Sequence, residues 1–335
     1  MLIFPLISLY RNGSLPQFIY RTIRLFKYTI MVVGGASALY LTSRYVARRY
    51  ISYSAGSIPT SQRALVDFLM HHRKMITNVR VAKAMSTTDR KHFLPSNIKN
   101  IYEDVPQPIG FNATLSAPHM AGLMLDFLAD HLTEGSIALD IGSGSGYISA
   151  CMAKMVGING RVVGVDHIQE LVDTSVENIT SALNSTKDSK LLSIISMNVG
   201  DGFKGHAQNA PYNCIYVGAA ASELPSELVN QLKVGGRMVI PVGPSNLFHE
   251  LLIVDKLPDG SIKVSPRGTV RFVPLTSKQE QLNPANVANA TKVIQLNGQK
   301  CLVRAEFIPA PDSADYKAYE QKYNQGINKV SAKQA

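Results

Sequence analysis

The sequence predicts an α/β fold built on a mostly parallel sheet. Short apolar runs alternate with longer segments in which apolar residues recur at helical spacing, which is the pattern of consecutive βα units. A glycine-rich turn, Gly142-Ser143-Gly144-Ser145-Gly146, follows one of these runs, and Asp166 ends the next. The chain has 335 residues, of which 45% are hydrophobic, so it can bury one substantial core.

Residues 1–56 form a basic segment that differs from the rest. The first 66 residues contain no Asp or Glu and carry eight of the ten net positive charges. The uncharged run at residues 28–43 would span about 24 Å as a helix, short of the roughly 30 Å hydrocarbon layer unless flanking side chains snorkel. We interpret the segment as a mitochondrial targeting sequence, a membrane anchor or a start with neither role.

The remaining charge and the cysteines exclude other classes of function. From Asp67 onward the chain is nearly neutral and has no motif for reading nucleic acid, so we expect no nucleic-acid partner. Cys151, Cys214 and Cys301 have no paired spacing. The sequence therefore predicts neither a disulfide framework nor a metal site, and a reducing compartment is the simpler assumption.

Three helices are expected before the sheet. Residues 61–75 and 79–93 predict a helical cap over the sheet, followed by a loop that contains Pro106 and Pro108. The next apolar residues form a single stripe at helical spacing. They are Met120, Leu123, Met124, Phe127, Leu128 and Leu132. This third helix is expected to pack against the core.

The glycine turn lies in the first βαβ unit. Ile137–Ile141 predicts a buried strand, Tyr147–Val156 a helix, and Arg161–Asp166 a second strand. Glycines let the backbone turn tightly and approach a ligand closely. An acid at the end of the second strand, here Asp166, is placed to accept hydrogen bonds from the ribose hydroxyls of an adenosine.

The spacing of the glycines indicates which ligand carries that adenosine. Nicotinamide enzymes use G-x-G-x-x-G, which would need glycine at Tyr147, whereas this chain has G-x-G-x-G preceded by Asp140. A carboxylate at that position would repel a pyrophosphate and attract a sulfonium or an amino group. We therefore favour S-adenosylmethionine, with a dinucleotide or a purely structural turn as the alternatives.

The alternation continues to the end of the predicted sheet. The expected elements are a helix at 170–182, strands at 192–199 and 213–217, a helix at 223–232 and a strand at 237–242. Strands at 250–257 and 262–264 form a hairpin turned at Asp259-Gly260, and a strand at 269–273 follows. The sheet should thus have five parallel strands and antiparallel end strands.

Beyond the sheet, residues 283–335 form a C-terminal extension of unknown role. Residues 293–307 contain strand-like stretches and residues 314–323 favour a helix. The sequence of this extension contains no motif that indicates a catalytic or binding function.

Several segments outside the glycine turn match one family. They are Gln107-Pro108-Ile109-Gly110-Phe111, Thr114-Leu115-Ser116-Ala117-Pro118-His119-Met120, Val165-Asp166-His167, Gly200-Asp201-Gly202, Val217-Gly218-Ala219-Ala220-Ala221 and Val273-Pro274-Leu275-Thr276. With these segments, residues from about 60 to 281 resemble protein-L-isoaspartate (D-aspartate) O-methyltransferases, and S-A-P-H-M is the most specific of them. Generic methyltransferases share only the glycine turn and the position of Asp166.

The resemblance implies a Rossmann-like class I S-adenosylmethionine-dependent methyltransferase fold over residues 57–282. It also implies a monomeric catalytic domain, a cytoplasmic location by family default, and age-damaged proteins containing isoaspartate as partners. The implied reaction moves a methyl group from S-adenosylmethionine to the α-carboxylate of L-isoaspartyl and D-aspartyl residues, and the ester then closes to a succinimide. A carboxylate is already ionised at neutral pH, so no general base is required and alignment must supply the rate.

The same resemblance implies the site. Ser116 is the implied catalytic residue, which orients the acceptor carboxylate. The implied cofactor-binding residues, with those of the glycine turn, are Thr114, Leu115, Asp140, Gly142, Ser143, Gly144, Gly146, Asp166, His167, Asp201, Gly202, Thr276 and Gln281. Plainer interpretations are that Ser116 caps the following helix, that Asp201 stabilises a turn and that His119 is a buried hydrogen-bonding partner.

Two positions depart from the family, and two other functions stay open. Asn213 stands where the family commonly has Asp, which removes a charge, and Ala121 stands where it often has His, which removes a possible cofactor contact. The alternatives are a small-molecule methyltransferase, and a non-catalytic cofactor-binding adaptor that recruits partners through its C-terminal tail.

Overall fold

The computed structural model describes residues 59–244, 248–282, 293–296 and 299–302. The predictions for residues 1–56, including the run at 28–43, lie outside the described residues, as does the predicted helix at 314–323. In the part of the chain that is described, no helix has the length and apolar character needed to span a membrane.

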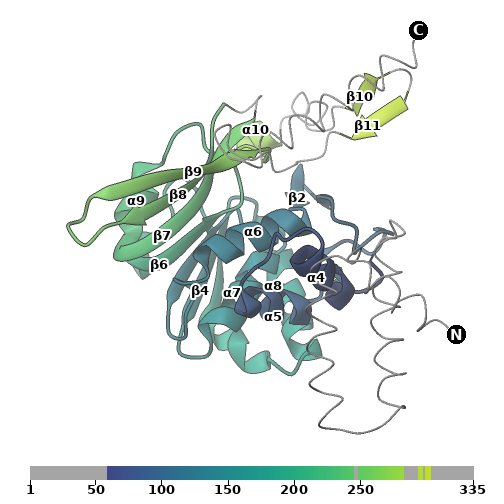
Figure 1. Ribbon diagram of the computed structural model, residues 1–335, viewed down its shortest axis with the longest axis horizontal. Helices are drawn as coiled ribbons and strands as arrows, with labels where there is room; N and C mark the ends of the chain where they lie inside the picture. Colours follow the sequence, from purple (N-terminus) through teal and green to yellow (C-terminus); the bar gives the residue numbers. More distant parts are fainter. Residues whose placement is uncertain (1–58, 245–247, 283–292, 297–298, 303–335) are drawn as a thin grey trace, which may run out of the picture. The chain divides into compact units, whose positions relative to one another are not determined.

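A seven-stranded sheet forms the centre of the described domain (Figure 1). Its strands are β3 (Ile137–Ile141), β4 (Arg161–Asp166), β5 (Ile195–Val199), β6 (Tyr212–Val217), β7 (Leu232–Val242), β8 (His249–Lys256) and β9 (Ile262–Val270). In the order β5-β4-β3-β6-β7-β8-β9 the first five are parallel, and β8 and β9 pair antiparallel at one edge. The predicted parallel sheet with antiparallel end strands is confirmed.

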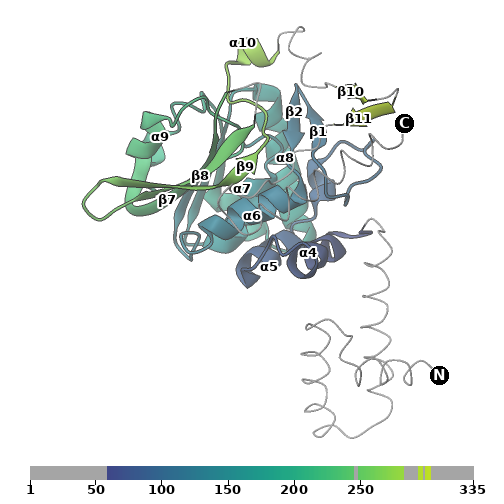
Figure 2. The same ribbon diagram turned by 45° about the horizontal axis from the view of Figure 1, so that its top comes forward.

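The helices lie on the two faces of this sheet. They are α4 (Gln62–His71), α5 (Val79–Thr87), α6 (Pro118–Leu128), α7 (Tyr147–Val156), α8 (Gln169–Ser185) and α9 (Ser226–Gln231), with a short α10 (Lys278–Gln281) near the end. The first five lie together on one face, and α9 lies on the other (Figure 2). The domain is therefore a three-layer α/β structure in which α4 and α5 form the expected helical cap.

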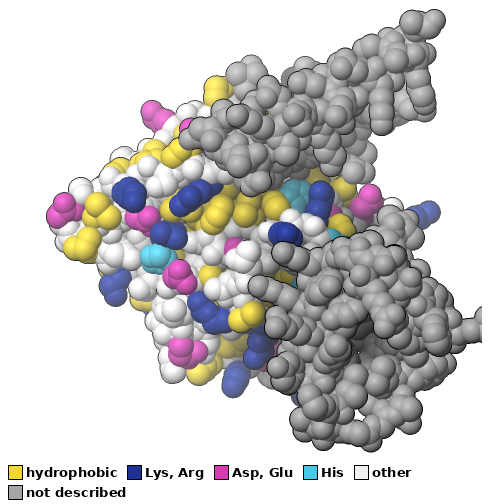
Figure 3. All heavy atoms as spheres, viewed as in Figure 1, with side chains coloured by type: hydrophobic (Ala, Val, Ile, Leu, Met, Phe, Trp, Pro, Cys, Tyr) yellow, Lys and Arg dark blue, Asp and Glu magenta, His cyan; other side chains and the backbone are white. Residues whose placement is uncertain are grey.

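Two apolar clusters fill the spaces between these layers. Because side chains alternate along a strand, Ala138 and Cys214 pack toward α7, whereas Leu139 and Ile215 pack on the face that carries α9. All four side chains are fully buried. Over the described part of the face drawn in Figure 3, Asp and Glu side chains are scattered among the Lys and Arg side chains.

The first two predicted helices begin within one residue of the expected position but end earlier, at His71 and Thr87, and capping side chains explain where they begin. The N-cap Ser61 accepts a hydrogen bond from the Ala64 N–H, and Asn78, the N-cap of α5, accepts one from the Arg80 N–H. The remainder of the helix predicted at 79–93 is a 3₁₀ turn, η1 (Arg90–Phe93). Asp126 of α6 also accepts hydrogen bonds from the backbone N–H groups of residues 77 and 78, which fixes the break between α4 and α5.

Other differences lie in the short elements. The start of the strand predicted at 192–199 is a 3₁₀ turn, η2 (Ser189–Ile194), and a further 3₁₀ turn is η3 (Ala207–Asn209). The strands predicted at 262–264 and 269–273 are one strand, β9, which continues through Pro266 because it is the edge strand and its register shifts locally. Within the extension, β10 (Val293–Leu296) and β11 (Gln299–Leu302) pair antiparallel.

A small hairpin was not predicted, because its segment was interpreted as a loop. It consists of β1 (Gln107–Gly110) and β2 (Ala113–Leu115), which pair antiparallel. Gly110, Phe111 and Asn112 all have positive φ values of 93°, 50° and 58°. Such values are uncommon for Phe, so this turn depends on contacts made elsewhere in the molecule.

Candidate active site

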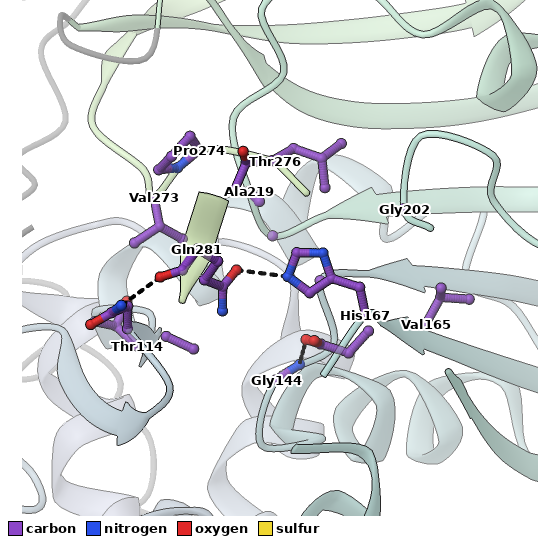
Figure 4. Close-up of a pocket in the computed structure, with 16 residues that line it drawn as sticks. Thr114, Gly144, Val165, His167, Gly202, Ala219, Val273, Pro274, Thr276 and Gln281 are labelled. Carbon is purple, nitrogen blue, oxygen red and sulfur yellow. Dashed lines mark hydrogen bonds between the residues drawn. The ribbon is translucent and has the colours of Figure 1, made fainter. Parts of the chain in front are cut away.

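Two adjoining cavities lie beside the glycine turn and the ends of the parallel strands. The first, about 550 Å³ with the adjoining space that is open to solvent, is lined by Asn112, Ala113, Thr114, Gly142, Gly144, Val165, Asp166, His167, Gly202, Gly218, Ala219, Val273, Pro274, Leu275, Thr276 and Gln281 (Figure 4). Ligands of open α/β sheets bind at this edge, beyond the carboxyl ends of the strands. The first cavity thus brings together segments that are far apart in the sequence.

The glycine turn is held in shape by Asp166. Gly142 and Gly144 have φ values of 70° and 49°, which residues with a Cβ rarely adopt. The Asp166 carboxylate accepts hydrogen bonds from the Gly144 N–H at 3.0 Å and from the Ile168 N–H at 3.1 Å. Asp166 therefore ties the turn to the start of α8, and it also lines the first cavity.

The presence of glycine at position 146 is explained by the backbone conformation and by the packing of α7 against α8. It is the N-cap of α7, with a φ of 84°, and a Cβ there would lie 2.8 Å from the Cδ1 of Ile179. Its absence of a side chain lets α8 pack closely against the start of α7. Gly146 is not among the residues that line either cavity.

A clasp of hydrogen bonds made by Gln281 closes one side of the first cavity. Its side-chain amide donates to the Phe111 carbonyl at 2.8 Å, and its backbone carbonyl accepts from the Asn112 amide at 2.6 Å. The His167 Nε2 lies 2.8 Å from the Gln281 Oε1 and donates to it, because an amide oxygen can only accept (Figure 4). The clasp therefore joins α10 to the β1–β2 turn and to the end of β4.

The segment before α10 forms the remaining wall. The Leu275 N–H donates to the Ala220 carbonyl at 2.7 Å, and the Ala220 N–H donates to the Val273 carbonyl at 2.9 Å. The Thr276 hydroxyl is hydrogen-bonded to the Glu280 carboxylate within the same segment. Residues 273–276 are thereby fixed against the loop that follows β6.

The second cavity adjoins the first and contains Ser116. It measures about 370 Å³ with the adjoining space that is open to solvent, and it is lined by Thr114, Leu115, Ser116, Ala121, Gly142, Ser143, Gly144, Ser145, Tyr147, Ile148, Tyr216 and Gly218. Four of these residues, Thr114, Gly142, Gly144 and Gly218, also line the first cavity. One elongated ligand can therefore extend from the glycine turn into the space beside Ser116.

Ser116 does not cap the helix that follows it. The N-cap of α6 is Ala117, no side chain caps that helix, and Pro118 occupies its first position. Ser116 is partly exposed, and its hydroxyl makes no hydrogen bond to another described residue. The hydroxyl is thus available to a ligand in the second cavity.

Hydrogen bonds between the buried residue His119 and Asp104 support the segment after Ser116. Asp104 accepts hydrogen bonds from the backbone N–H of His119 at 2.9 Å and from its Nδ1 at 2.8 Å, and Arg73 lies 3.3 Å away. Burial opposes ionisation of Asp104, but the hydrogen bonds from His119 and the charge of Arg73 outweigh it and hold the pKa below its ordinary value. His119 is buried and lines neither cavity, so its position fits the plainer interpretation of a hydrogen-bonding partner.

Asp140 lies in the core, on the side of the sheet that carries α7. Its carboxylate is 1% exposed and accepts a hydrogen bond of 2.6 Å from the Ser149 hydroxyl. Burial raises the pKa of Asp140 to about 7, against the hydrogen bonds from Ser149, and the nearby charge of Asp166 raises it further. Asp140 lines neither cavity, although the sequence predicts a cofactor contact for it.

Asp201, for which the sequence also predicts a cofactor contact, lines neither cavity. It is exposed, and its carboxylate accepts a hydrogen bond from the Phe203 N–H at 3.0 Å, which forms a tight turn. Its neighbour Gly202 lines the first cavity. Of the predicted site residues, those that line one or both cavities are Thr114, Leu115, Ser116, Gly142, Ser143, Gly144, Asp166, His167, Gly202, Thr276 and Gln281.

Asn112 and Tyr216 are among the lining residues that the sequence did not assign to the site. Asn112 follows Gly110-Phe111, and Gly and Asn close together are a turn signal that could have indicated the hairpin. Tyr216 stands inside the apolar run of β6, where it cannot be told from a core tyrosine. Only the three-dimensional structure places it in the wall of the cavity that also contains Ser116.

The two departures from the family have visible outcomes. The Asn213 Oδ1 accepts a hydrogen bond of 2.9 Å from the Ile137 N–H, so the contact between β6 and β3 does not need a charge. Ala121 is buried and lines the second cavity. A small side chain there leaves room beside Ser116.

Comparisons with known proteins agree on one family. The sequence model of protein-L-isoaspartate (D-aspartate) O-methyltransferase matches residues 60–280. A relative from Dictyostelium discoideum is 51% identical over 267 residues, covering 78% of this chain and 83% of its own. Protein-L-isoaspartate O-methyltransferase 2 of Arabidopsis thaliana is 50% identical over 230 residues, covering 69% of this chain and 72% of its own.

A solved structure matches as well. A candidate protein-L-isoaspartate O-methyltransferase of Plasmodium falciparum, crystallised with S-adenosyl-L-homocysteine, has a TM-score of 0.58 and 30% identity. The match covers 65% of this chain and 99% of that one. The fold is thus that of S-adenosylmethionine-dependent methyltransferases, and the chain belongs to the protein-L-isoaspartate (D-aspartate) O-methyltransferase family.

Proposed function

We propose that the protein transfers a methyl group from S-adenosylmethionine to the α-carboxylate of L-isoaspartyl and D-aspartyl residues in damaged proteins. The observation that carries this proposal is the pair of adjoining cavities, which connects the glycine turn and Asp166 to the hydroxyl of Ser116. Membership of the family supplies the acceptor, which the glycine turn alone leaves open.

The residues of the first cavity fit an adenosine. Gly142 and Gly144 leave the turn without side chains, and the Asp166 carboxylate lies at the end of β4, where it can accept hydrogen bonds from ribose hydroxyls. His167, Thr276 and Gln281 would hold the adenosine from the opposite wall. S-adenosylmethionine supplies a methyl group on a cationic sulfur, which becomes a neutral thioether when the methyl group leaves.

Ser116 would orient the acceptor. The α-carboxylate of an isoaspartyl residue is ionised at neutral pH, so a carboxylate oxygen can attack without a base and no proton is transferred. One hydrogen bond from the Ser116 hydroxyl fixes its direction without the neutralisation that a salt bridge would bring. Positioning of this kind can contribute on the order of 7 kcal/mol to the rate.

The test compares two peptides that differ at one residue. The protein and radiolabelled S-adenosylmethionine are incubated with an isoaspartyl peptide and with its ordinary aspartyl twin, and base-labile methyl ester is counted. We expect ester only on the isoaspartyl peptide. Cofactor binding without ester would favour the adaptor, and methylation of small acids without preference for the peptide would favour a small-molecule methyltransferase.

Three further parts of the proposal rest on the sequence alone. We propose that the catalytic domain spans residues 57–282 and is monomeric, that residues 28–43 associate with a membrane when the segment is retained, and that residues 283–335 form a separate extension. Light scattering of the purified protein checks its mass in solution. Fusion of residues 1–66 to a fluorescent protein distinguishes organelle import from membrane association.

A further inference from the structure

Two residues in the wall of the second cavity, Ser143 and Tyr216, have buried hydroxyl groups that lack partners among the described residues. Among the described residues, neither the Ser143 Oγ nor the Tyr216 hydroxyl has a hydrogen-bond partner, although both side chains are buried. An unpaired buried hydroxyl destabilises a folded protein, because the group has lost its hydrogen bonds to water. Such groups are therefore expected where a ligand supplies the missing partner.

The register of β6 against β3 determines where Tyr216 lies in the wall of the second cavity. It lies beside Asp140 on the neighbouring strand, on the side of the sheet that carries α7. Its Cε1 lies 3.6 Å from the place that a Cβ on Gly218 would occupy, and Gly218 lines both cavities. One edge of the ring thus lies near Gly218, which stands at the boundary between the two cavities.

The start of α7 meets the same cavity. Ser145, Tyr147 and Ile148 line it, and this ten-residue helix has a glycine N-cap without a side-chain hydrogen bond. The first N–H groups of a helix and its dipole favour an anionic group. Burial raises the pKa of the Tyr216 phenol far above its ordinary value, so the phenol stays protonated and can donate.

We infer that Tyr216 and Ser143 bind the carboxylate of the amino-acid end of S-adenosylmethionine, beside the first turn of α7. This inference rests on the proposed function. With the adenosine beside Asp166, a cofactor that passes Gly142 and Gly144 enters the second cavity with its amino-acid end. A protein-bound acceptor, by contrast, approaches from solvent and meets the exposed Thr114 and the partly exposed Ser116 first.

The test uses Tyr216→Phe and three adenosine ligands in calorimetric titrations of the full chain. S-adenosylhomocysteine carries the whole amino acid, its decarboxylated analogue lacks only the carboxylate, and 5′-methylthioadenosine lacks the amino acid altogether. We expect the variant to bind S-adenosylhomocysteine about tenfold or more weakly, because it loses a hydrogen bond to a charged group. The other two ligands should bind the variant and the wild type alike. Ser143→Ala should show the same pattern.

A matched control lies on the same strand. The Tyr212 hydroxyl is buried but satisfied, since it donates to the His206 carbonyl at 2.6 Å, and Tyr212 lines neither cavity. Tyr212→Phe should therefore lower the melting temperature and leave all three affinities unchanged. Tyr216→Phe should not lower the melting temperature of the ligand-free protein, because it removes an unsatisfied group.

Three outcomes overturn the inference. Unchanged affinity of Tyr216→Phe for S-adenosylhomocysteine removes the contact, and an equal loss for the decarboxylated analogue assigns the hydroxyl to the ammonium group. A higher KM for the isoaspartyl peptide with unchanged cofactor affinity assigns it to the acceptor. If the wild-type protein binds no S-adenosylhomocysteine, the proposed function itself fails, which is a different result.

Discussion

Ser116 and Asp166 line adjoining cavities, but they differ in the hydrogen bonds that their side chains make to the rest of the protein. The Ser116 hydroxyl makes no hydrogen bond to a described residue, whereas both carboxylate oxygens of Asp166 already accept backbone N–H groups. Loss of the Ser116 hydroxyl should therefore leave the surrounding backbone unchanged. Loss of the Asp166 carboxylate removes a support of the glycine turn together with a ligand contact.

We predict that Ser116→Ala lowers kcat by about tenfold to a hundredfold, the effect of one lost hydrogen bond to a charged group, and hardly changes cofactor affinity. Steady-state kinetics with an isoaspartyl peptide and titration with S-adenosylhomocysteine measure the two quantities. Asp166→Ala is the opposite case, in which the Kd for the cofactor rises and the melting temperature falls. Equal losses of turnover and affinity in Ser116→Ala would reject the orienting role.

Asp140 makes stability depend on pH. Its pKa is about 7 in the folded protein and near its ordinary 3.8 in the unfolded chain. Between these values the folded protein holds a proton that the unfolded chain has released, so stability falls as the pH rises from about 4 to 7 and stays low above 7.

We predict that Asp140→Asn, which removes this titration, raises the free energy of unfolding at pH 8 by up to about 4 kcal/mol. The gain should shrink steadily as the pH is lowered toward 4. Urea denaturation at pH 4, 6 and 8 measures it. Ser149→Ala is the companion variant, because it removes a hydrogen bond that favours the ionised form and should enlarge the penalty at pH 8. A gain independent of pH would contradict the titration.

The helices and strands that can be predicted from the sequence are those defined by interactions between residues close together in the chain. The bounds predicted for β3, α7 and β4 agree with the structure, because glycines and apolar periodicity define these elements locally. The β1–β2 hairpin was missed, since its turn has positive φ values that are held by the distant Gln281. The pattern of residues near the hairpin cannot indicate a contact with a residue so far away in the sequence.

The hydrogen bonds that Gln281 of α10 makes across the first cavity are expected to help hold the cofactor. Gln281→Ala removes two side-chain hydrogen bonds and leaves the backbone carbonyl that Asn112 binds, so we expect S-adenosylhomocysteine to bind about five to thirty times more weakly. Fluorescence or calorimetric titration gives the Kd. Lys278→Ala, an exposed position on the same helix, is the matched control and should bind as the wild type does. An unchanged Kd in both variants would show that the clasp does not hold the cofactor.

At the scale of the whole domain, the site gathers residues from both ends of the described fold. Its walls come from the β1–β2 hairpin, the glycine turn, the ends of β4 and β6, and residues 273–281. Spacing along the chain indicated the glycine turn and Asp166, and the family resemblance indicated Ser116 and the closing segment. Neither could show that Asp140 faces the core or that Tyr216 reaches the second cavity, because both depend on which face of the sheet a residue occupies.

A ligand that joins these segments should stabilise the whole domain. With S-adenosylhomocysteine at 100 times its Kd, the expected gain is about 2.7 kcal/mol, which corresponds to a rise in melting temperature of roughly 5 to 10 °C. Thermal denaturation with and without ligand tests this. Adenosine at the same multiple of its own Kd is the control and should give an equal shift, because the gain depends on saturation and not on ligand size.

The position of Gln281 has a consequence for how the protein is made. During synthesis, a chain that has been extended only as far as residue 270 contains every strand of the central sheet, yet it still lacks the closing wall and the clasp. The ability to hold cofactor therefore arises after the sheet has been completed, in the last few residues of the domain. A protease that cuts between residues 270 and 281 would leave a product that keeps the sheet but binds the cofactor weakly.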